Sequence, residues 1–493
     1  AVWAQGDGRF TATWAVVMPS DPTCLQAPAS MSFESTADVS AAAAFGAKSI
    51  GIVGSLAVLL NNILGPGIAD FSGLYQQTGW LMPSVTTLVC VASSIASGDM
   101  LLAAIQSYPG NADFNVRVEY GTLCRFFFPR RVAHFCQGIF QLAMLTANIS
   151  NIVQTAQVLD YFVASLNHHQ SCALMFYPHV AGICTESETD ITPFGPGKIV
   201  LSVGMILVAV LSIPLGYYNL EDNIMVQNVA LVIIIVSICI WVFIFCMLGI
   251  EAERVPVVGT SFHDMGGTVL FNFMFISTIP SWICEKKPSV PPLRVIIGTL
   301  CIAILGYSLV GVLGGMAFEP YYMTDNTLLS QLNHISDQEA PGVRLTAFAS
   351  VQAYAISANL ASIPIFSILM RYNLIEAKIL GKQAAGAASV LVPFGCSVLL
   401  YTGEGFKKAV AFCGTFTSAF VNLMVPTLLF MAAMRTTRSV PHCSPYAETP
   451  RLPSARECLF ARGRPQKLWN AIAWVNLLAM AGLTLIAIVE QFW

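Results

Sequence analysis

The run Asn61-Asn62-Ile63-Leu64-Gly65-Pro66-Gly67 lies inside the first long apolar stretch of the chain and interrupts it. A second interruption, Ser277-Thr278-Ile279-Pro280, lies inside a later apolar stretch. Proline removes a backbone donor and glycine weakens a helix, so these motifs predict broken helices. In a membrane, the backbone groups freed by a break must face protein, water or a ligand, because hydrocarbon cannot bond to them.

Long apolar runs repeat along the chain and identify an integral membrane protein. Charged residues are 10% of the sequence, against about 25% in soluble domains, and the mean hydropathy is +0.67. Each run is long enough to cross about 30 Å of hydrocarbon as a helix. We expect an all-α membrane fold of eleven transmembrane helices: 49–75, 80–106, 132–164, 197–217, 224–250, 266–284, 294–318, 345–370, 383–401, 408–434 and 468–489.

The positive charges are distributed unequally between alternate loops. If the N-terminus is inside, 19 of the 24 Lys and Arg residues fall on the inner side. The positive-inside rule then predicts a cytoplasmic N-terminus and a C-terminus on the opposite side of the membrane. The membrane can be the plasma membrane or an organelle membrane.

The first ten spans divide into two halves of five, and each half begins with a broken span. Because five is odd, the two halves have opposite orientations. The expected segments are a cytoplasmic, mostly disordered tail (1–48), a transporter core (49–434) with repeats 49–250 and 266–434, a cytoplasmic linker rich in Pro, Arg and Ser (435–467), and an eleventh transmembrane helix (468–493).

Paired breaks in matching halves are the best sequence indication of a transporter's binding site. The second part of the first broken helix begins near Gly67, where free amides and the helix dipole suit a carboxylate. The first part of the sixth span ends near Ser277 and offers carbonyls to an ammonium group. The alternative is a kink that serves packing alone. The candidate substrate-binding residues are Asn62, Gly65, Pro66, Gly67, Ile68, Phe273, Phe275, Ser277 and Thr278.

Several motifs resemble one family. They are the first break with Gln77-Thr78-Gly79-Trp80, the run Phe271-Asn272-Phe273 leading into IPSWICEKKP (279–288), and Ile363-Pro364-Ile365-Phe366-Ser367-Ile368 running into Arg371-Tyr372-Asn373-Leu374. Over about residues 49–434 the chain resembles the amino acid/auxin permease family, in particular the protist-type amino acid transporters of the APC superfamily.

The resemblance implies a fold like that of the bacterial leucine transporter, with a 5+5 inverted repeat and broken helices 1 and 6. It also implies cotransport of amino acids with protons or sodium. The chain departs from the family at Pro66, where sodium-coupled neutral members usually carry a small residue, and in the polar stretch Ala69-Asp70-Phe71. Both departures leave the substrate and the ion open.

Three residues are candidates for ion coupling. Asn61 matches a family Asn that resembles part of a sodium site, and Ser362 matches a hydroxyl ligand; the alternative for both is interhelical hydrogen bonding. Asp70 is the carboxylate nearest to the first break and the candidate proton acceptor, unless it is a solvated acid in the outer vestibule. We expect H⁺ or Na⁺ as the coupling ion, with no cofactor and no other metal.

Three further features lie near the ends of spans. Glu285 and Lys286 are candidates for an inner gate or for a topology anchor. Cys172 and Cys184 fall in one outer loop and are expected either to form a disulfide or to remain free thiols. Asp160, near the outer end of the third span, is expected to face solvent.

No motif indicates an enzyme, since phosphate loops, metal-protease signatures and cofactor fingerprints are missing from the sequence. The small number of charges argues against nucleic acid as a partner. The expected function is secondary active transport of amino acids, neutral rather than cationic, by alternating access. The alternative is a transporter-like amino acid sensor or a non-transporting membrane scaffold subunit. The expected partners are the substrate and membrane lipids; the sequence identifies no partner subunit.

Overall fold

A computed structural model gives the conformation of the protein. It describes residues 48–167, 170–186, 194, 197–262, 265–273, 275–319, 328–333, 341–402, 416–439 and 466–492. Nearly all of the expected N-terminal tail (1–48), and residues 440–465 of the expected linker (435–467), lie outside these residues. The described residues belong to one compact unit, which begins at Gly46.

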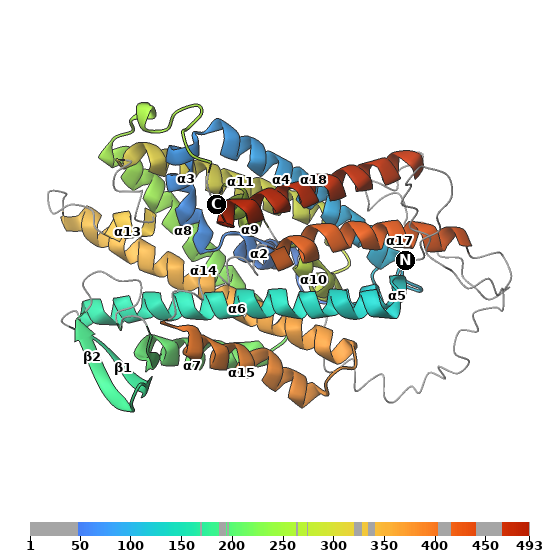
Figure 1. Ribbon diagram of the computed structural model, residues 1–493, viewed down its shortest axis with the longest axis horizontal. Helices are drawn as coiled ribbons and strands as arrows, with labels where there is room; N and C mark the ends of the chain where they lie inside the picture. Colours follow the sequence, from blue (N-terminus) through green and yellow to red (C-terminus); the bar gives the residue numbers. More distant parts are fainter. Residues whose placement is uncertain are drawn as a thin grey trace, which may run out of the picture. The chain divides into compact units, whose positions relative to one another are not determined.

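Long helices form most of this unit (Figure 1). At the end of α8 the sequence explains the stop: Gly249 follows the helix with a φ of 95°, which favours glycine. The helices are α2 Ile52–Ile63, η1 Pro66–Ala69, α3 Asp70–Thr78, α4 Leu81–Gln106, α5 Tyr120–Phe127, α6 Arg130–Leu166, α7 Val203–Tyr217, α8 Ile224–Leu248, η2 Ala252–Arg254, α9 Met265–Asn272, η3 Ile276–Thr278, α10 Ile279–Glu285, α11 Pro292–Ala317, α13 Leu328–Asn333, α14 Pro341–Glu376, α15 Lys382–Leu400, η4 Phe420–Met424, α17 Val425–Ser439 and α18 Gln466–Phe492.

Eight spans of the described residues are long and apolar enough to cross a membrane, and the bent pair Ile52–Ile63 and Gly67–Thr78 makes a ninth. The other two expected spans correspond to α6, which has 37 residues, and α7, an apolar helix of 15 residues. At 1.5 Å per residue, α6 is roughly 55 Å long. The count of eleven and the inverted repeat remain predictions.

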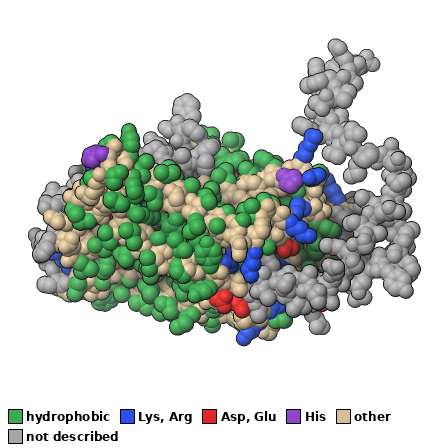
Figure 2. Space-filling view, turned by 90° about the horizontal axis from the view of Figure 1, so that it is seen from below, with side chains coloured by type: hydrophobic (Ala, Val, Ile, Leu, Met, Phe, Trp, Pro, Cys, Tyr) green, Lys and Arg blue, Asp and Glu red, His purple; other side chains and the backbone are tan. Residues whose placement is uncertain are grey.

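Apolar side chains cover much of the surface in Figure 2. Those exposed on α8 recur at helical spacing: Met225, Val229, Val232, Val236, Phe243 and Met247. Soluble proteins rarely expose such continuous apolar patches. The chain is therefore an integral, multi-pass membrane protein whose surface contacts lipid.

Lys and Arg side chains gather mainly towards one end of the described unit, the end at which α5 lies in Figure 1. Lys48 and Lys286 both contact Phe114, and Arg117 pairs with Glu285. We call it the basic end and define it by Lys48, Arg117, Arg125, Arg130, Lys286 and Arg371.

The prediction of an all-α fold was wrong at the opposite end, where three strands form an antiparallel sheet in the order β2-β1-β3. The strands are β1 Gln170–Tyr177, β2 Ala181–Glu186 and β3 Ile199–Ser202. β3 takes up the start of the expected span 197–217, because its backbone pairs with β1. The helix begins only at Val203, where the Ser202 hydroxyl accepts from the Met205 amide at 3.1 Å.

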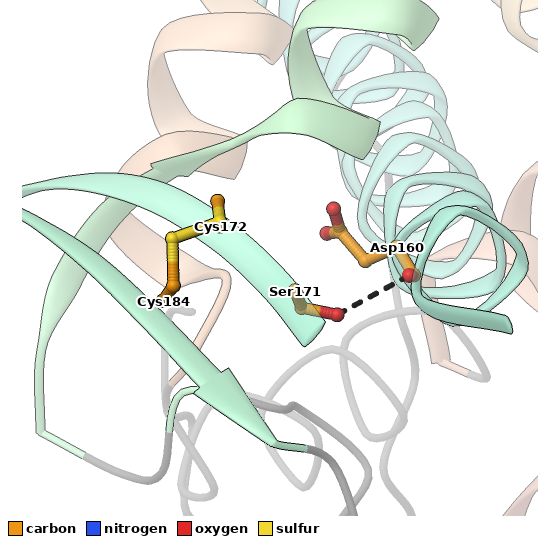
Figure 3. Close-up of a disulfide and its surroundings, with 4 residues drawn as sticks. All are labelled: Asp160, Ser171, Cys172 and Cys184. Carbon is orange, nitrogen blue, oxygen red and sulfur yellow. Dashed lines mark hydrogen bonds between the residues drawn. A yellow bond between two sulfur atoms is a disulfide. The ribbon is translucent and has the colours of Figure 1, made fainter. Parts of the chain in front are cut away.

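Cys172 and Cys184 face each other across β1 and β2 and form a disulfide (Figure 3). Their Cα atoms are 4.1 Å apart. The bridge therefore joins two strands that the backbone hydrogen bonds already align, and it stabilises the hairpin itself. Beside it, the Ser171 hydroxyl donates to the Asp160 carbonyl oxygen at 3.3 Å.

Asp160 is 1% exposed, so the expectation of a solvated carboxylate was wrong. Its carboxylate accepts from the Gly204 amide at 2.7 Å and from the Tyr401 hydroxyl. The end of α6 itself is exposed at Ser165 and Leu166. Ser171 of β1 and Gly204 of α7 nevertheless pack against Asp160 about one and a half turns earlier and shield it. Asp160 thereby links α6 to α7 and to the residue that follows α15.

Replacing Asp160 with Ala should lower the free energy of unfolding. The Gly204 amide and the Tyr401 hydroxyl would lose a buried partner, which costs about 1–3 kcal/mol per group. Thermal unfolding of the purified protein in detergent measures the effect, with the exposed Glu253→Gln as a control. Equal midpoints for the two variants would contradict the role assigned to Asp160.

Candidate functional site

The first break lies between α2 and α3, whose axes differ by 60° across η1. Pro66 is the first residue of η1, where a missing amide hydrogen removes no helical bond. The Tyr307 hydroxyl on α11 lies 2.7 Å from the Ile63 carbonyl oxygen, and the Tyr354 hydroxyl on α14 lies 2.9 Å from that of Gly65. Two tyrosines thus bind carbonyls that the break frees.

The second break lies between α9 and α10, at residues 273–278. This is slightly earlier than the Ser277–Pro280 motif suggests, because Pro280 fits within the first turn of α10. The Phe273 carbonyl accepts from the Ser94 hydroxyl at 3.3 Å. The Ser277 amide donates to the Asn422 side-chain oxygen at 2.8 Å. Side chains of other helices again pair the freed backbone groups.

The two breaks contact each other directly. The Asn62 side-chain amide donates to the Thr278 hydroxyl. The Tyr307 hydroxyl that reaches Ile63 also lies 2.9 Å from the Asn272 side-chain oxygen. The bundle therefore brings the expected residues Asn62 and Thr278 together, and it adds Tyr307 as a bridge between both broken helices.

The two glycines of the first break have different surroundings. A Cβ atom added to Gly67 would lie 2.2 Å from the Asn272 side-chain oxygen, so Gly67 permits the close approach of the two broken helices. A Cβ atom added to Gly65 meets no atom of the described residues within 4 Å. Of these two positions, Gly67 is therefore the one where a side chain would collide with a neighbour.

Aromatic rings enclose one side of this junction. The ring centroids of Phe71 and Phe273 lie 4.4 and 5.2 Å from that of Tyr307. Phe273 and Phe275 are buried, whereas Phe271 is 43% exposed. Of these three phenylalanines, Phe273 and Phe275 therefore belong to the interior and Phe271 lies on the surface.

The backbone amide of Ile68 has a partner in this conformation. It donates to the Gly65 carbonyl at 3.3 Å within the η1 turn. This is a long hydrogen bond. A carboxylate placed at the start of α3 would compete with this bond for the amide.

Asn61 and Ser362, the candidate sodium ligands, are buried neighbours. The Ser362 hydroxyl donates to the Asn61 carbonyl at 3.2 Å and to the Ala358 carbonyl at 3.0 Å. The Asn61 side-chain amide donates to Gln227, at 2.9 Å to the backbone oxygen and 2.7 Å to the side-chain oxygen. These are interhelical hydrogen bonds of the kind expected in membrane bundles. The Asn61 side-chain oxygen is buried without a hydrogen bond in the described part of the chain, so it can still accept a cation or a donor.

Asp70 is exposed in the first turn of α3. A carboxylate in this position interacts favourably with the positive end of the helix dipole. Asp70 thus lies directly after the first break.

Glu285 and Lys286 lie at the basic end, where α10 meets the start of α2. The Ile50 amide donates to the Glu285 carbonyl at 3.1 Å, and the Lys287 amide donates to the Ile50 carbonyl at 2.9 Å. The side chains of Glu285 and Lys286 are 0% and 5% exposed. The first part of the first broken helix, α2, and the second part of the second broken helix, α10, are therefore fastened together at this end.

Sequence reasoning missed several residues of the site. Tyr307 and Tyr354 lie in the middle of apolar spans, where a buried hydroxyl needs a partner, and this is a signal that the sequence contains. Asn422 lies in η4, a π-helical turn, and such turns occur frequently at functional sites. The spacing of residues along the sequence predicts neither this π-helical turn nor the pairing of Arg117 with Glu119 and Glu285 at the basic end.

No protein-family model matches the chain. The chain is 20% identical over 274 residues to the sodium-coupled neutral amino acid transporter 7 of Danio rerio. The matched region covers 54% of each protein, so the chain spans about half the length of this curated relative.

Two solved structures have a similar fold. One is MHP1, a nucleobase-cation-symport-1 family transporter in a closed conformation with bromovinylhydantoin bound; its TM-score is 0.53 at 11% identity, over 90% of this chain and 91% of that one. The other is the Eremococcus coleocola manganese transporter in complex with an aromatic bis-isothiourea substituted compound, with a TM-score of 0.50 at 13% identity, over 89% and 94%. The likeness concerns the fold, which is one that membrane transporters use.

Tyr307→Phe should destabilise the junction of the two breaks. It removes the hydroxyl near the Ile63 carbonyl and the Asn272 side chain, at a cost of about 1–3 kcal/mol for the buried groups. Thermal unfolding in detergent measures the change. Tyr75→Phe is the matched control, because the Tyr75 hydroxyl has a contact of 3.3 Å with Ser84. A midpoint for Tyr307→Phe no lower than that of the control would contradict the bridging role.

Proposed function

We propose that the protein is a secondary active transporter that moves neutral amino acids across a membrane by alternating access. The observation that carries this proposal is the meeting of the two helix breaks at Asn62, Thr278 and Tyr307. Two interrupted helices that meet inside a bundle provide polar backbone groups at membrane depth, where transporters bind their substrates. The partial similarity to a sodium-coupled neutral amino acid transporter supports the substrate class.

The chemistry of the two breaks suits a zwitterion. The start of α3 offers the positive end of a helix dipole to a carboxylate. The end of α9 offers carbonyls, and Ser277 and Thr278 offer hydroxyls, to an ammonium group. Asp70 is the one ionisable residue in segments 61–70 and 271–280. A side chain without charge therefore fits this environment best.

Protons or sodium ions would drive the transport. Asn61 and Ser362 supply oxygen atoms of the type that hard cations prefer. Asp70 supplies an exposed carboxylate for a proton. The two possibilities differ in a measurable way, because only a proton site changes charge with pH.

Alternating access requires each end of the broken helices to open in turn. At the basic end, α2 and α10 are joined through Ile50. At the other end, the carbonyls of Thr78 and Gln77 accept from the amides of Gly259 and Thr260 at 2.8 and 3.1 Å. We assign the basic end and the N-terminus to the cytoplasm and the C-terminus to the opposite side, in the plasma membrane or an organelle membrane.

Uptake by the purified protein in liposomes tests this proposal. A labelled mixture of neutral amino acids is supplied under an imposed pH gradient and then under a sodium gradient. Accumulation would establish coupled transport and identify the ion. Binding of an amino acid without uptake would instead support the sensor or scaffold function.

Gly67→Ala should reduce uptake about tenfold, which corresponds to about 1.4 kcal/mol. The added methyl group would displace the Asn272 side chain and separate the two breaks. Gly138→Ala is the matched control and should retain uptake, because its methyl group, on the exposed side of α6, meets no described atom within 4 Å. Normal uptake by Gly67→Ala in these liposomes would exclude this junction as the binding site.

Asp70→Asn should flatten the dependence of uptake on pH if Asp70 carries the coupled proton. The amide cannot gain or lose a proton in the range where a carboxylate titrates. The measurement is uptake at a series of pH values with sodium held constant. An unchanged pH profile would remove Asp70 from the coupling role.

A further inference from the structure

One guanidinium lies between two buried carboxylates at the basic end. The Arg117 Nη2 atom is 3.0 Å from Glu119 Oε1 and 3.6 Å from Glu285 Oε1. Both glutamate side chains are 0% exposed, and that of Arg117 is 18% exposed. Two negative charges thus share this cation where water screens them weakly.

Other charged groups of the surrounding elements bind the backbone. The Arg371 guanidinium donates to the carbonyls of residues 216–218. The Arg125 guanidinium donates to the carbonyls of Glu376 and Ala377 at 2.8 Å. The charged and titratable groups on the elements around the cluster include Lys48, Asp113, Tyr120, Cys124, Arg125, Glu221, Asp222, Cys284, Lys286, Lys287, Arg371, Tyr372 and Glu376.

Arg117 keeps its charge. Burial lowers the pKa of the guanidinium, but the neighbouring acidic groups, Glu119 foremost, raise it, and the pKa ends above its usual value. A change in the charge of the trio must therefore occur on a carboxylate. The two buried carboxylates repel each other across one cation, and a proton on Glu285 would relieve this repulsion.

The same carboxylates hold four parts of the bundle together. Glu119 Oε2 accepts from the Ser281 hydroxyl of α10 at 2.5 Å. Glu285 Oε2 accepts from the Glu221 amide, between α7 and α8, at 2.9 Å. The Arg117 guanidinium carbon lies 4.3 Å from the centre of the Tyr372 ring on α14. The segment before α5, α10, the α7–α8 turn and α14 therefore meet at one charged cluster.

We propose that Glu285, beside Arg117 and Glu119, is a proton-binding site that controls the opening of the basic end. The inference rests on the proposed transport function, because only a transporter must open this end. With Glu285 ionised, Arg117 holds the segment before α5 against α10. A proton from the adjacent water adds to the Glu285 carboxylate and makes it a neutral acid, so Arg117 loses its ionic partner on α10 and the end opens. When the proton returns to the water, the ion pair forms again and closes the end.

This site is separate from Asp70. Asp70 is exposed on α3, beyond the first break, whereas Glu119 and Glu285 are buried at the basic end. The Asp70→Asn substitution concerns the ion that drives uptake. Glu285 instead determines when the basic end can release substrate.

Hydrogen–deuterium exchange of the unaltered protein tests the site without any substitution. Exchange is compared at about pH 5 and about pH 8, which bracket the range in which buried carboxylates titrate, after correction for intrinsic exchange rates. We expect the protection of residues 48–51 and 111–119 to fall about tenfold at the lower pH, because opening exposes their amides. The β1–β2 hairpin is the reference segment. Equal protection of 48–51 and 111–119 at both pH values would overturn the proposal.

Glu285→Gln mimics the protonated acid. It should show low protection of the same segments even at about pH 8, with little further change at low pH. Asp113→Asn is the matched control, because Asp113 is an exposed acid in the segment that contains Arg117, and it should respond to pH as the unaltered protein does. A full pH response in Glu285→Gln would overturn the assignment. If this variant does not fold, the exchange of the unaltered protein decides.

The two proposals fail in different ways. If no amino acid is taken up in liposomes but protection at the basic end still depends on pH, the transport function is wrong and the proton site stands. If uptake occurs but protection does not depend on pH, transport stands and the proton site is wrong. Glu285→Gln should also exchange labelled for unlabelled amino acid.

Discussion

The need to satisfy free backbone groups inside a membrane governs this structure. Each of the two broken helices exposes carbonyls and amides at a depth where lipid offers no partner. The bundle supplies partners from side chains of other helices: Tyr307 and Tyr354 for the first break, and Ser94 and Asn422 for the second. The breaks therefore determine which helices must lie beside them. They also leave these polar groups exchangeable, because a ligand can replace a side chain as the partner.

The sequence predicts the features that local chemistry dictates. Gly65-Pro66-Gly67 gives the first break, and apolar runs give most of the helices within a few residues. Sequence reasoning fails where the outcome depends on distant partners. The burial of Asp160 depends on a sheet that pairs residues 170–177 with residues 199–202. The close approach at Gly67 depends on Asn272, which is more than two hundred residues away along the chain.

The two ends of the broken helices are held by different contacts. At the basic end, Arg117, Glu119 and Glu285 join neutral backbone bonds. At the other end, the carbonyls of Gln77 and Thr78 accept from amides of residues 259 and 260, in a segment that Arg254 ties to α11. Salt and pH act on ionic pairs far more than on neutral hydrogen bonds. The pair between Arg117 and Glu285 thus makes the contact of α10 at the basic end sensitive to salt and pH.

The π-helical turn at Phe420–Met424 constrains the length of the chain around it. A π-turn accommodates one residue more than the α-helix around it. Loss of one residue here would restore a regular helix and rotate what precedes the turn relative to α17 by about 100°, the angle of one helical residue. Asn422 would then point away from the Ser277 amide, which it now binds at 2.8 Å. Related chains that keep this contact should therefore tolerate substitutions around the turn far better than single-residue deletions.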